Sequence, residues 1–363
     1  MKAKDAGTGM SASLEAELLA LTPVLEALGY TLEEEQLHIG GERYLMSPTK
    51  LVLMGQSKDG KRVVIKAAHS KEGKAEMKGE KQARDLLAKL SFANDSLHMP
   101  AELHFGEHGE YLVFITEYIE QEKIFVDRPL EEQFFLTLRA FEAQEMFHAS
   151  TYEHLREIRD VFKKVSAKEY IQEFASFKEE TLTKCPDERL AAVLEKSESF
   201  LREHEATIDR YANHLTHTDF VPHNLRLHGR IIYLLDYAAL CFANRHESWA
   251  RFLNYMVVHN PALEKLLVEH LRSTRGADEY LSLRLMRVFK LGFLLRYYAR
   301  SLEKTSGNLS ELTRLRIMLW TQVLECILED KEVPSTLIEE YIHTRNGLRS
   351  EEEKVRQREF AVA

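Results

Sequence analysis

A group of polar side chains in the middle of the chain has a spacing that suits metal chemistry. His217, Asp219 and Asn224 lie in a turn-prone stretch, in which Pro222 blocks helix formation. An apolar, partly β-branched run follows and ends at Asp236. Carboxylate and amide oxygens are the ligands that a hard cation such as Mg²⁺ prefers. The spacing therefore indicates a divalent-metal site with a further carboxylate beside it.

A β-hairpin is the element that would bring these ligands together. A strand pattern begins after Asn224, a turn follows at His228-Gly229, and a second apolar strand ends before Asp236. The midpoint between Asn224 and Asp236 falls at Arg230, beside the turn. Antiparallel pairing across that turn would place both residues at the same end of the ribbon.

A lysine near the end of an apolar strand is a second candidate for chemistry. Residues 62–67 read Arg-Val-Val-Ile-Lys-Ala, so the Lys66 ammonium needs an anionic partner to offset its burial. Residues 72–90 form a charged amphipathic helix, with Glu80 on or beside its apolar face and Glu76 one turn earlier as the alternative partner. A surface lysine and an exposed helical charge pair are the simpler interpretations.

In this chain order, the residues resemble those of a known family. The pattern His217-x-Asp219-x4-Asn224, followed by an aspartate that closes an apolar strand, resembles the catalytic and metal-binding loops of the protein kinase-like fold. It is similar to the variant in the aminoglycoside phosphotransferase and choline kinase branch, whose loop typically reads His-Gly-Asp-Leu-His-Pro-Gly-Asn. Thr218 and His223 replace the two glycines of that loop.

The resemblance implies catalytic and metal-binding roles. Asp219 would orient the acceptor hydroxyl and accept its proton, while His217 would fix the catalytic loop by hydrogen bonds behind it. Asn224 and Asp236 would hold Mg²⁺ on the phosphates of ATP.

It also implies nucleotide contacts. Lys66 would draw charge from the α and β phosphates and would be steadied by Glu80. The apolar strand over 111–116 runs into Glu-Tyr-Ile, which resembles the kinase hinge, so the Glu117 carbonyl and the Ile119 N–H would bind the adenine edge. Because these are backbone contacts, the choice between ATP and GTP stays open.

The segment expected to cover the phosphates departs from the kinase pattern. Residues 40–49 read Gly-Gly-Glu-Arg-Tyr-Leu-Met-Ser-Pro-Thr and lack G-x-G-x-x-G. Backbone N–H groups could still bind phosphate here, and Ser47 or Thr49 could add a hydroxyl.

The patterns predict an α+β, two-lobed protein kinase-like fold, with a small antiparallel sheet and one key helix in the N-lobe and a large, mainly helical C-lobe. Leucines at helical spacing follow Ser13, and Thr22-Pro23 is predicted to split that helix in two. The expected parts are an N-terminal extension with a helix (1–30), the N-lobe (31–120), the C-lobe (121–346, with the catalytic loop 217–224 and Asp236) and a charged tail (347–363).

Composition narrows the choice of partners. The net charge of -9 argues against a nucleic-acid footprint, and no apolar run is long enough to span a membrane. The three cysteines lie far apart without metal-ligand spacing, which fits a reducing compartment, so we expect a cytoplasmic protein. An acidic chain is also compatible with a cationic substrate, although acidity spread over a surface usually serves solubility.

The leading hypothesis is an enzyme, an ATP-dependent small-molecule kinase that phosphorylates a hydroxyl group with Mg²⁺ as cofactor. The alternative is a non-catalytic nucleotide-binding pseudokinase or scaffold of the same fold, and a third possibility is modification of a protein or an envelope sugar. Three residues that follow the metal-binding aspartate either line the acceptor pocket or pack and cap a helix: Glu247, Trp249 and Arg251. The sequence leaves the acceptor and the oligomeric state open.

Overall fold

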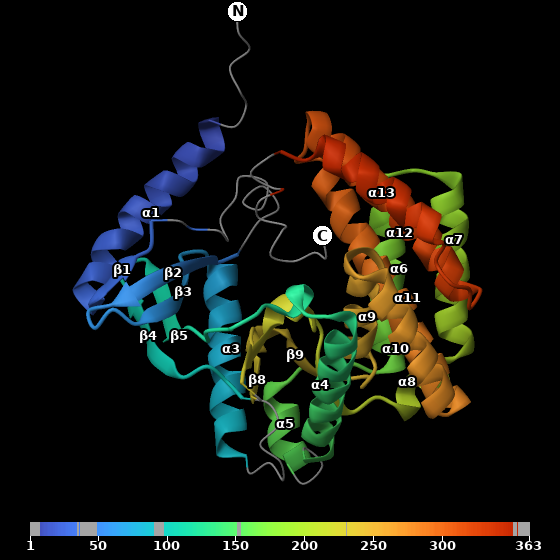
Figure 1. The fold of residues 1–363 in the computed structure, drawn as a ribbon, viewed down its shortest axis with the longest axis horizontal. Coiled ribbons are helices and arrows are strands. Elements are labelled where there is room, and N and C mark those ends of the chain that lie inside the picture. The colour runs from blue at the N-terminus through green and yellow to red at the C-terminus, as the bar shows by residue number, and fades with distance from the viewer. Residues whose placement is uncertain are drawn as a thin grey trace, which may run out of the picture. The chain divides into compact units, whose positions relative to one another are not determined.

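The structure is a computed structural model that describes residues 8–34, 36, 49–90, 98–150, 154–229, 231–350 and 354. The chain divides into two compact units, of which the first consists of Met1–Gln82 and Met99–Glu120 and the second of Ala83–His98 and Gln121–Ala363. The first unit contains an antiparallel sheet and the second is mainly helical (Figure 1). The predicted α+β fold class is confirmed.

The first unit is built on a five-stranded antiparallel sheet in the order β1-β2-β3-β5-β4. In strand β3, Lys66 is opposite Val52 on one side and Phe114 on the other. Side chains alternate between the two faces of a strand, so Lys66 shares a face with Ala68 and not with Ile65. The strands are β1 (Tyr30–Leu32), β2 (Leu51–Ser57), β3 (Arg62–Ala68), β4 (Glu102–His108) and β5 (Tyr111–Glu117).

Two helices cover opposite faces of this sheet. Helix α1 (Thr8–Leu28) packs Leu21 against the face that contains Ile65. Helix α3 (Lys71–Lys89) packs Met77 against the other face, which contains Ala68. Strand β3 is therefore buried on both sides, which explains why apolar residues occupy both of its faces around Lys66.

The predicted break of the first helix at Thr22-Pro23 is wrong. Helix α1 continues through Pro23, although proline removes one backbone hydrogen bond and crowds the preceding turn. Leu21 and Leu25, on either side of Pro23, are almost completely buried against the sheet. Packing of the helix therefore outweighs the local cost of the proline.

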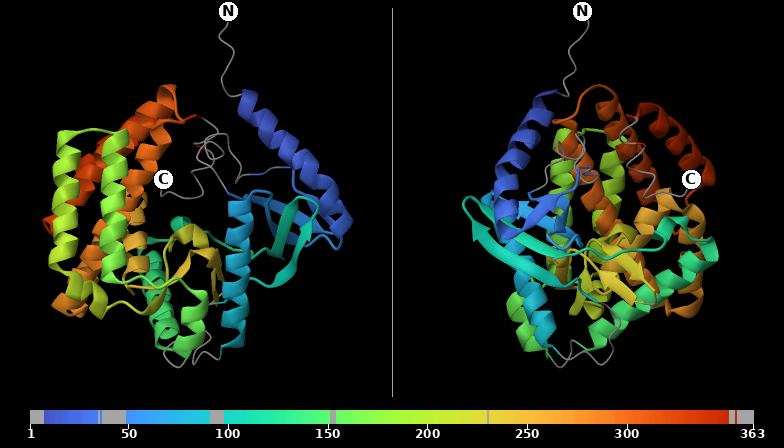
Figure 2. Two further views of the ribbon diagram at one scale, coloured as in Figure 1. Left: turned by 180° about the vertical axis from the view of Figure 1, so that it is seen from behind. Right: turned by 60° about the vertical axis from the view of Figure 1, so that its left-hand side comes forward.

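Helices form most of the second unit (Figure 2). The long helix α11 lies at their centre, because it packs against α6, α7, α9 and α12. Helices α7 and α8 follow each other directly, with a turn at His204 between them. No described helix is long and apolar enough to cross a membrane. The helices are α4 (Leu130–Ser150), α5 (Leu155–Val161), α6 (Ala167–Lys184), α7 (Glu188–Glu203), α8 (Glu205–Arg210), α9 (Glu247–His259), α10 (Pro261–Thr274), α11 (Ala277–Leu302), α12 (Gly307–Leu328) and α13 (Ser335–Leu348).

Two small antiparallel ribbons complete the second unit. The predicted hairpin is present as β7 (Leu225–His228) and β8 (Ile231–Leu234). Its register differs by one residue from the predicted one, because the Leu235 N–H donates to the Asn224 carbonyl at 2.8 Å. Asn224 is thus opposite Leu235, and Asp236 follows directly after the paired residues.

The sequence analysis missed three short strands. One is β1. The sequence pattern also predicts a strand over residues 36–40, most of which lie outside the described residues. The other two are β6 (His214–His217) and β9 (Leu240–Ala243), which pair with each other. Strand β6 ends at His217, so this ribbon supports the beginning of the predicted catalytic loop.

Candidate active site

Lys66 and Glu80 form an ion pair within the first unit. Lys66 Nζ lies 2.7 Å from both carboxylate oxygens of Glu80. The Glu80 side chain is 2% exposed and that of Lys66 14%. Two charges this far removed from water stabilise each other only in good hydrogen-bonding geometry, which the bidentate contact provides. The structure thus brings together the two residues that the sequence paired, while their role toward a nucleotide stays a prediction.

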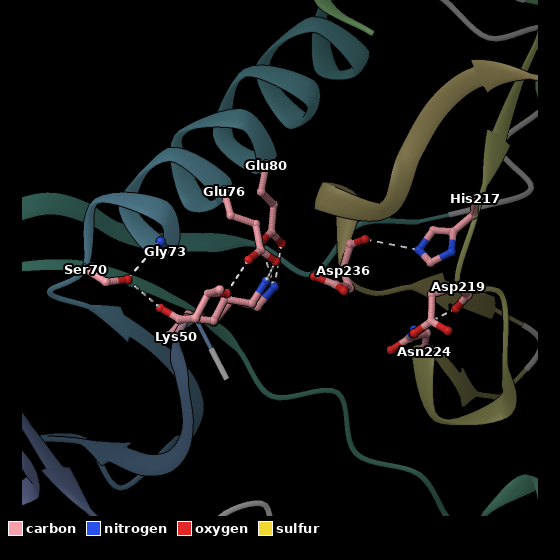
Figure 3. A network of polar contacts seen from close by, with 11 residues as sticks. Lys50, Ser70, Gly73, Glu76, Glu80, His217, Asp219, Asn224 and Asp236 are labelled. Carbon is pink, nitrogen blue, oxygen red and sulfur yellow. Dashed lines mark hydrogen bonds and ion pairs between the residues drawn. The ribbon is translucent and has the colours of Figure 1, made fainter. Parts of the chain in front are cut away.

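Glu76, the alternative partner of Lys66, is engaged elsewhere (Figure 3). Its carboxylate accepts hydrogen bonds of 2.5 Å from Lys50 Nζ and from Thr49 Oγ1. The Thr49 hydroxyl, predicted as a possible phosphate ligand, is therefore bound to a carboxylate in the structure. The other residues of the predicted phosphate-covering segment, 40–48, lie outside the described residues.

The start of α3 is fixed to the segment before β2. Ser70 Oγ accepts the Gly73 N–H at 3.0 Å and donates to the Thr49 carbonyl at 3.2 Å (Figure 3). A Cβ atom at Gly73 would lie 1.9 Å from the Thr49 carbonyl oxygen, so only glycine permits this approach. The contact fixes the position of the helix that carries Glu80.

The predicted adenine-binding backbone lies at the end of β5. The Glu117 N–H donates to the Ala101 carbonyl at 3.0 Å. The Ala101 N–H donates to the Glu117 side chain at 2.7 Å and not to the Glu117 carbonyl. The Ile119 N–H makes no hydrogen bond to another described backbone group. Adenine binding by the Glu117 carbonyl and the Ile119 N–H stays a prediction.

His217 holds the catalytic loop against the segment after the hairpin. Its Nε2 lies 3.0 Å from the Leu235 carbonyl oxygen and 3.1 Å from that of Asp236 (Figure 3). Burial lowers the pKa of His217 below its usual value, so the ring is neutral at pH 7. Two carbonyl acceptors at Nε2 favour the tautomer that carries its proton there. His217 thus makes hydrogen bonds of the expected kind, while its role in catalysis stays a prediction.

Asp219 lies at the centre of a network of three side chains. Its Oδ2 accepts a hydrogen bond of 3.0 Å from the Asn224 amide nitrogen, which also donates to the Asp219 carbonyl at 2.8 Å. Its Oδ1 accepts a hydrogen bond of 2.8 Å from Nε of Arg251, on helix α9. The structure thus brings Asp219 and Asn224 together as expected and adds a guanidinium.

The neighbouring charges keep Asp219 ionised. Burial raises the pKa of its carboxyl group, but Arg251 and then His223 lower it, with a net result well below the usual range. A carboxylate with a low pKa is a weak base. The site is therefore better suited to orienting a hydroxyl than to removing its proton early.

Asp236 has an unusual backbone conformation. Its φ of 57° and ψ of 61° place it in the left-handed region, which non-glycine residues rarely adopt. The Asp236 carbonyl accepts the Ala239 N–H at 3.0 Å in addition to the His217 ring. Such conformations persist where surrounding contacts impose them, often at functional sites.

The side chains at this end of the hairpin fit a hard cation. The Asn224 amide nitrogen donates both of its hydrogen bonds to Asp219. The Asn224 amide oxygen, Oδ1, is therefore a possible metal ligand. The Asp236 carboxylate would be the second oxygen ligand from the protein. The described residues contain no group of three or more His, Cys, Asp or Glu placed to hold a metal. Mg²⁺ in phosphate chemistry commonly has only one or two protein carboxylates and takes its other ligands from phosphate and water.

The structure resolves the alternatives for the residues at the start of α9. Glu247 is buried and accepts a hydrogen bond of 3.1 Å from Lys290, and Trp249 stacks on Phe141 with ring centroids 4.5 Å apart. Both residues therefore pack the helix. Arg251 instead donates a hydrogen bond to Asp219, and a role toward an acceptor stays a prediction for this residue.

Comparison with known proteins places the fold. No protein-family model and no curated protein matches the sequence, whereas many solved structures match the fold. The apo form of a thermostable mutant of aminoglycoside phosphotransferase APH(4)-Ia has a TM-score of 0.60 at 16% identity, covering 85% of this chain and 97% of that chain.

Two further structures lead to the same conclusion. The GDP complex of wild-type aminoglycoside 2'-phosphotransferase-IIIa has a TM-score of 0.59 at 12% identity, covering 88% of this chain and 98% of that chain. Macrolide 2'-phosphotransferase type I has a TM-score of 0.54 at 13% identity, with 87% and 99% covered. The chain therefore has the protein kinase-like fold of the aminoglycoside and macrolide phosphotransferases.

Proposed function

We propose that the chain is a phosphotransferase that moves the γ-phosphate of ATP to a hydroxyl group of a small molecule. The observation that carries the proposal is the arrangement of the catalytic loop, in which Asn224 bonds to Asp219 and His217 bonds to the Asp236 carbonyl. The fold supports the reaction class, because a solved complex of one similar protein contains ADP and hygromycin B and that of another contains GDP.

Asp219 orients the acceptor hydroxyl and takes its proton. The hydroxyl oxygen forms a bond to the γ-phosphorus, and the bond from that phosphorus to the β–γ bridging oxygen breaks. ADP leaves with the bridging oxygen, and Asp219 releases the proton to solvent. Phosphoryl transfer depends mainly on positioning and charge stabilisation, so the low pKa of Asp219 is compatible with this role.

The other residues bind and position the nucleotide. Lys66 contacts the α and β phosphates, and Glu80 fixes the direction of the lysine side chain. Asn224 and Asp236 would hold Mg²⁺, which when bound neutralises charge on the phosphates. The Glu117 carbonyl and the Ile119 N–H would bind the purine base. Because both are backbone groups, they discriminate little between ATP and GTP by themselves.

The test is ADP release by the purified protein with Mg²⁺ and ATP or GTP over a panel of alcohols. Asp219→Asn should lower turnover by about 10²-fold or more, as expected for loss of a general base, with nucleotide affinity nearly unchanged. Asp59→Asn, in the exposed turn between β2 and β3, is the matched control. A folded Asp219→Asn protein with the wild-type rate would contradict the proposal.

One observation favours a second candidate, a non-catalytic nucleotide-binding protein of the same fold. The Asp219 carboxylate is already engaged by Arg251, and a base held in an ion pair is less available to a hydroxyl. Nucleotide binding that depends on Mg²⁺, without Asp219-dependent ADP release on any acceptor, would support this candidate.

A further inference from the structure

Helix α9 presents one partly exposed stripe of three residues. Arg251, Tyr255 and His259 are each partly exposed, whereas residues 252–254 and 256–258 are buried. A spacing of four residues places side chains on the same face of an α-helix. The residue that contacts Asp219 is thus the first member of a continuous surface.

The stripe and the catalytic loop are in contact. The rings of Tyr255 and His259 stack with centroids 3.9 Å apart and an interplanar angle of 9°. The guanidinium carbon of Arg251 lies 5.9 Å from the Tyr255 ring centroid. The ring of His223, in the catalytic loop, packs against Tyr255 from another side at 5.8 Å. Together these residues form a surface that begins at the proposed catalytic base.

Arg251 has hydrogen-bonding capacity to spare at this surface. Its Nε donates to Asp219, and within the described part of the chain neither Nη atom makes a hydrogen bond. The Arg251 side chain is 25% exposed, so a ligand can reach it. The end of a guanidinium group binds a carboxylate or phosphate with two parallel hydrogen bonds.

The surroundings of the stripe are cationic. Burial, together with the nearby charges of Arg345, His223 and Arg349, lowers the pKa of His259 to about 3. His259 is therefore neutral and adds aromatic surface, while the charge comes from the arginines. The chain as a whole carries a net charge of -9, so this positive charge is a local feature of the surface near the stripe.

We infer that the acceptor is a small alcohol that carries an oxyanion group, a carboxylate or a phosphate, bound by the Nη atoms of Arg251. This inference rests on the proposed phosphotransferase function. The hydroxyl would contact Asp219 and the oxyanion the far end of the guanidinium that is bonded to it, so the two groups must be only a few bonds apart. Tyr255 would form the apolar wall. A polycationic acceptor such as an aminoglycoside would meet like charge here.

The experiment compares acceptors that share one skeleton. ADP release with Mg²⁺ and ATP is measured with glycerate, glycerol 3-phosphate and neutral glycerol, and separately with the aminoglycoside hygromycin B. We expect kcat/KM for at least one of the two anionic compounds to exceed that for glycerol and hygromycin B by about tenfold or more, since charge-assisted bidentate bonds are strong. The two anionic arms separate a carboxylate from a phosphate acceptor.

Variants of Arg251 test the contact itself. Arg251→Gln should raise KM for the preferred anionic acceptor by about tenfold or more, with KM for ATP within about twofold of wild type. Arg251→Lys should recover only part of the loss, because it retains charge but not the planar fork. Arg300→Gln removes an exposed arginine that pairs with Glu180 and serves as the control, with no expected change.

The outcomes separate this inference from the proposed function. If glycerol or hygromycin B serves as well as the anionic compounds, or if Arg251→Gln affects all acceptors equally, the oxyanion inference is wrong and the phosphotransferase function stands. If no acceptor gives ADP release that depends on Asp219, both are wrong.

Discussion

The Asp219 carboxylate has to orient a hydroxyl while Arg251 engages its charge, and this competition should be visible in the pH dependence of kcat. In the wild type the depressed pKa keeps Asp219 ionised across the whole working range, so kcat should show no acid limb from this residue above about pH 4. Arg251→Gln removes the strongest lowering influence and leaves burial, which raises the pKa. The acid limb should then move upward, into the range of about pH 4 to 6.

The measurement is a pH profile of kcat at saturating nucleotide and acceptor. Arg300→Gln should reproduce the wild-type profile, since its partner Glu180 lies on α6, outside the contacts of Asp219. Identical acid limbs in the wild type and in Arg251→Gln would show that Arg251 does not set the ionisation of Asp219.

The sequence predicted that most of the candidate site residues lie near one another, because they are close together along the chain. His217, Asp219 and Asn224 belong to one loop, and the following hairpin leads to Asp236, so spacing alone indicates their proximity. Arg251 contacts Asp219 from a separate helix 32 residues later. The spacing of four between Arg251, Tyr255 and His259 can be seen in the sequence. Whether that face of the helix is directed toward Asp219 depends on tertiary packing, which the spacing does not predict.

At the scale of elements, the Lys66–Glu80 pair adds a buried ionic contact between β3 and α3 to their apolar packing. Lys66→Met should lower the free energy of unfolding by about 3 kcal/mol, because it leaves the buried Glu80 carboxylate without its cation. The double variant Lys66→Met/Glu80→Gln should recover much of that loss. The measurement is urea unfolding of each variant.

The matched control is Lys78→Met. Lys78 pairs with Glu107 across an exposed contact, in which both side chains are more than half exposed, so its loss should destabilise the protein much less than the loss of Lys66. Equal losses for Lys66→Met and Lys78→Met would mean that burial adds nothing to the importance of the Lys66 pair.

The contact between α11 and α6 permits a similar comparison of two helical glycines. A Cβ atom at Gly292 would lie 2.3 Å from Phe174 Cε2, whereas at Gly79 it would meet nothing within 4 Å. Gly292→Ala should destabilise by about 1 to 3 kcal/mol through overpacking, and Gly79→Ala should stabilise by up to about 1 kcal/mol through helix propensity. Thermal unfolding that shifts both variants in the same direction would contradict this account.

The elements that the sequence predicted well are long and periodic, such as the helix predicted over residues 72–90, which the structure shows as α3. Those it missed depend on partners. Strands β6 and β9 have four residues each and are defined by pairing between distant segments. Pro23 signals a helix break locally, but burial of the leucines around it decides the outcome.

For the whole molecule, the central question is whether folding is linked to a nucleotide. A ligand that binds only the native state stabilises it by RT ln(1 + [L]/Kd), which is about 2.7 kcal/mol at a hundredfold excess over Kd. With Mg²⁺ and ATP or a non-hydrolysable analogue, Tm should therefore rise measurably. The amino-acid composition indicates a globular protein. It does not predict stabilisation by a nucleotide, because that depends on the few polar groups that would bind the phosphates and the metal.

Asp236→Asn should abolish the part of the Tm shift that requires Mg²⁺, because an amide replaces the proposed carboxylate ligand. Lys66→Met in the Glu80→Gln background should reduce the shift even without the metal, since Lys66 is assigned to the phosphates. In Asp59→Asn, Tm should rise as much as in the wild type.

If the Mg²⁺-dependent rise in Tm is unchanged in Asp236→Asn, residues other than Asp236 bind the metal. If neither ATP nor GTP raises Tm, the proposed nucleotide chemistry is wrong. A Mg²⁺-dependent shift without ADP release on any acceptor would favour the non-catalytic candidate, in which the Asp219–Arg251 pair remains closed.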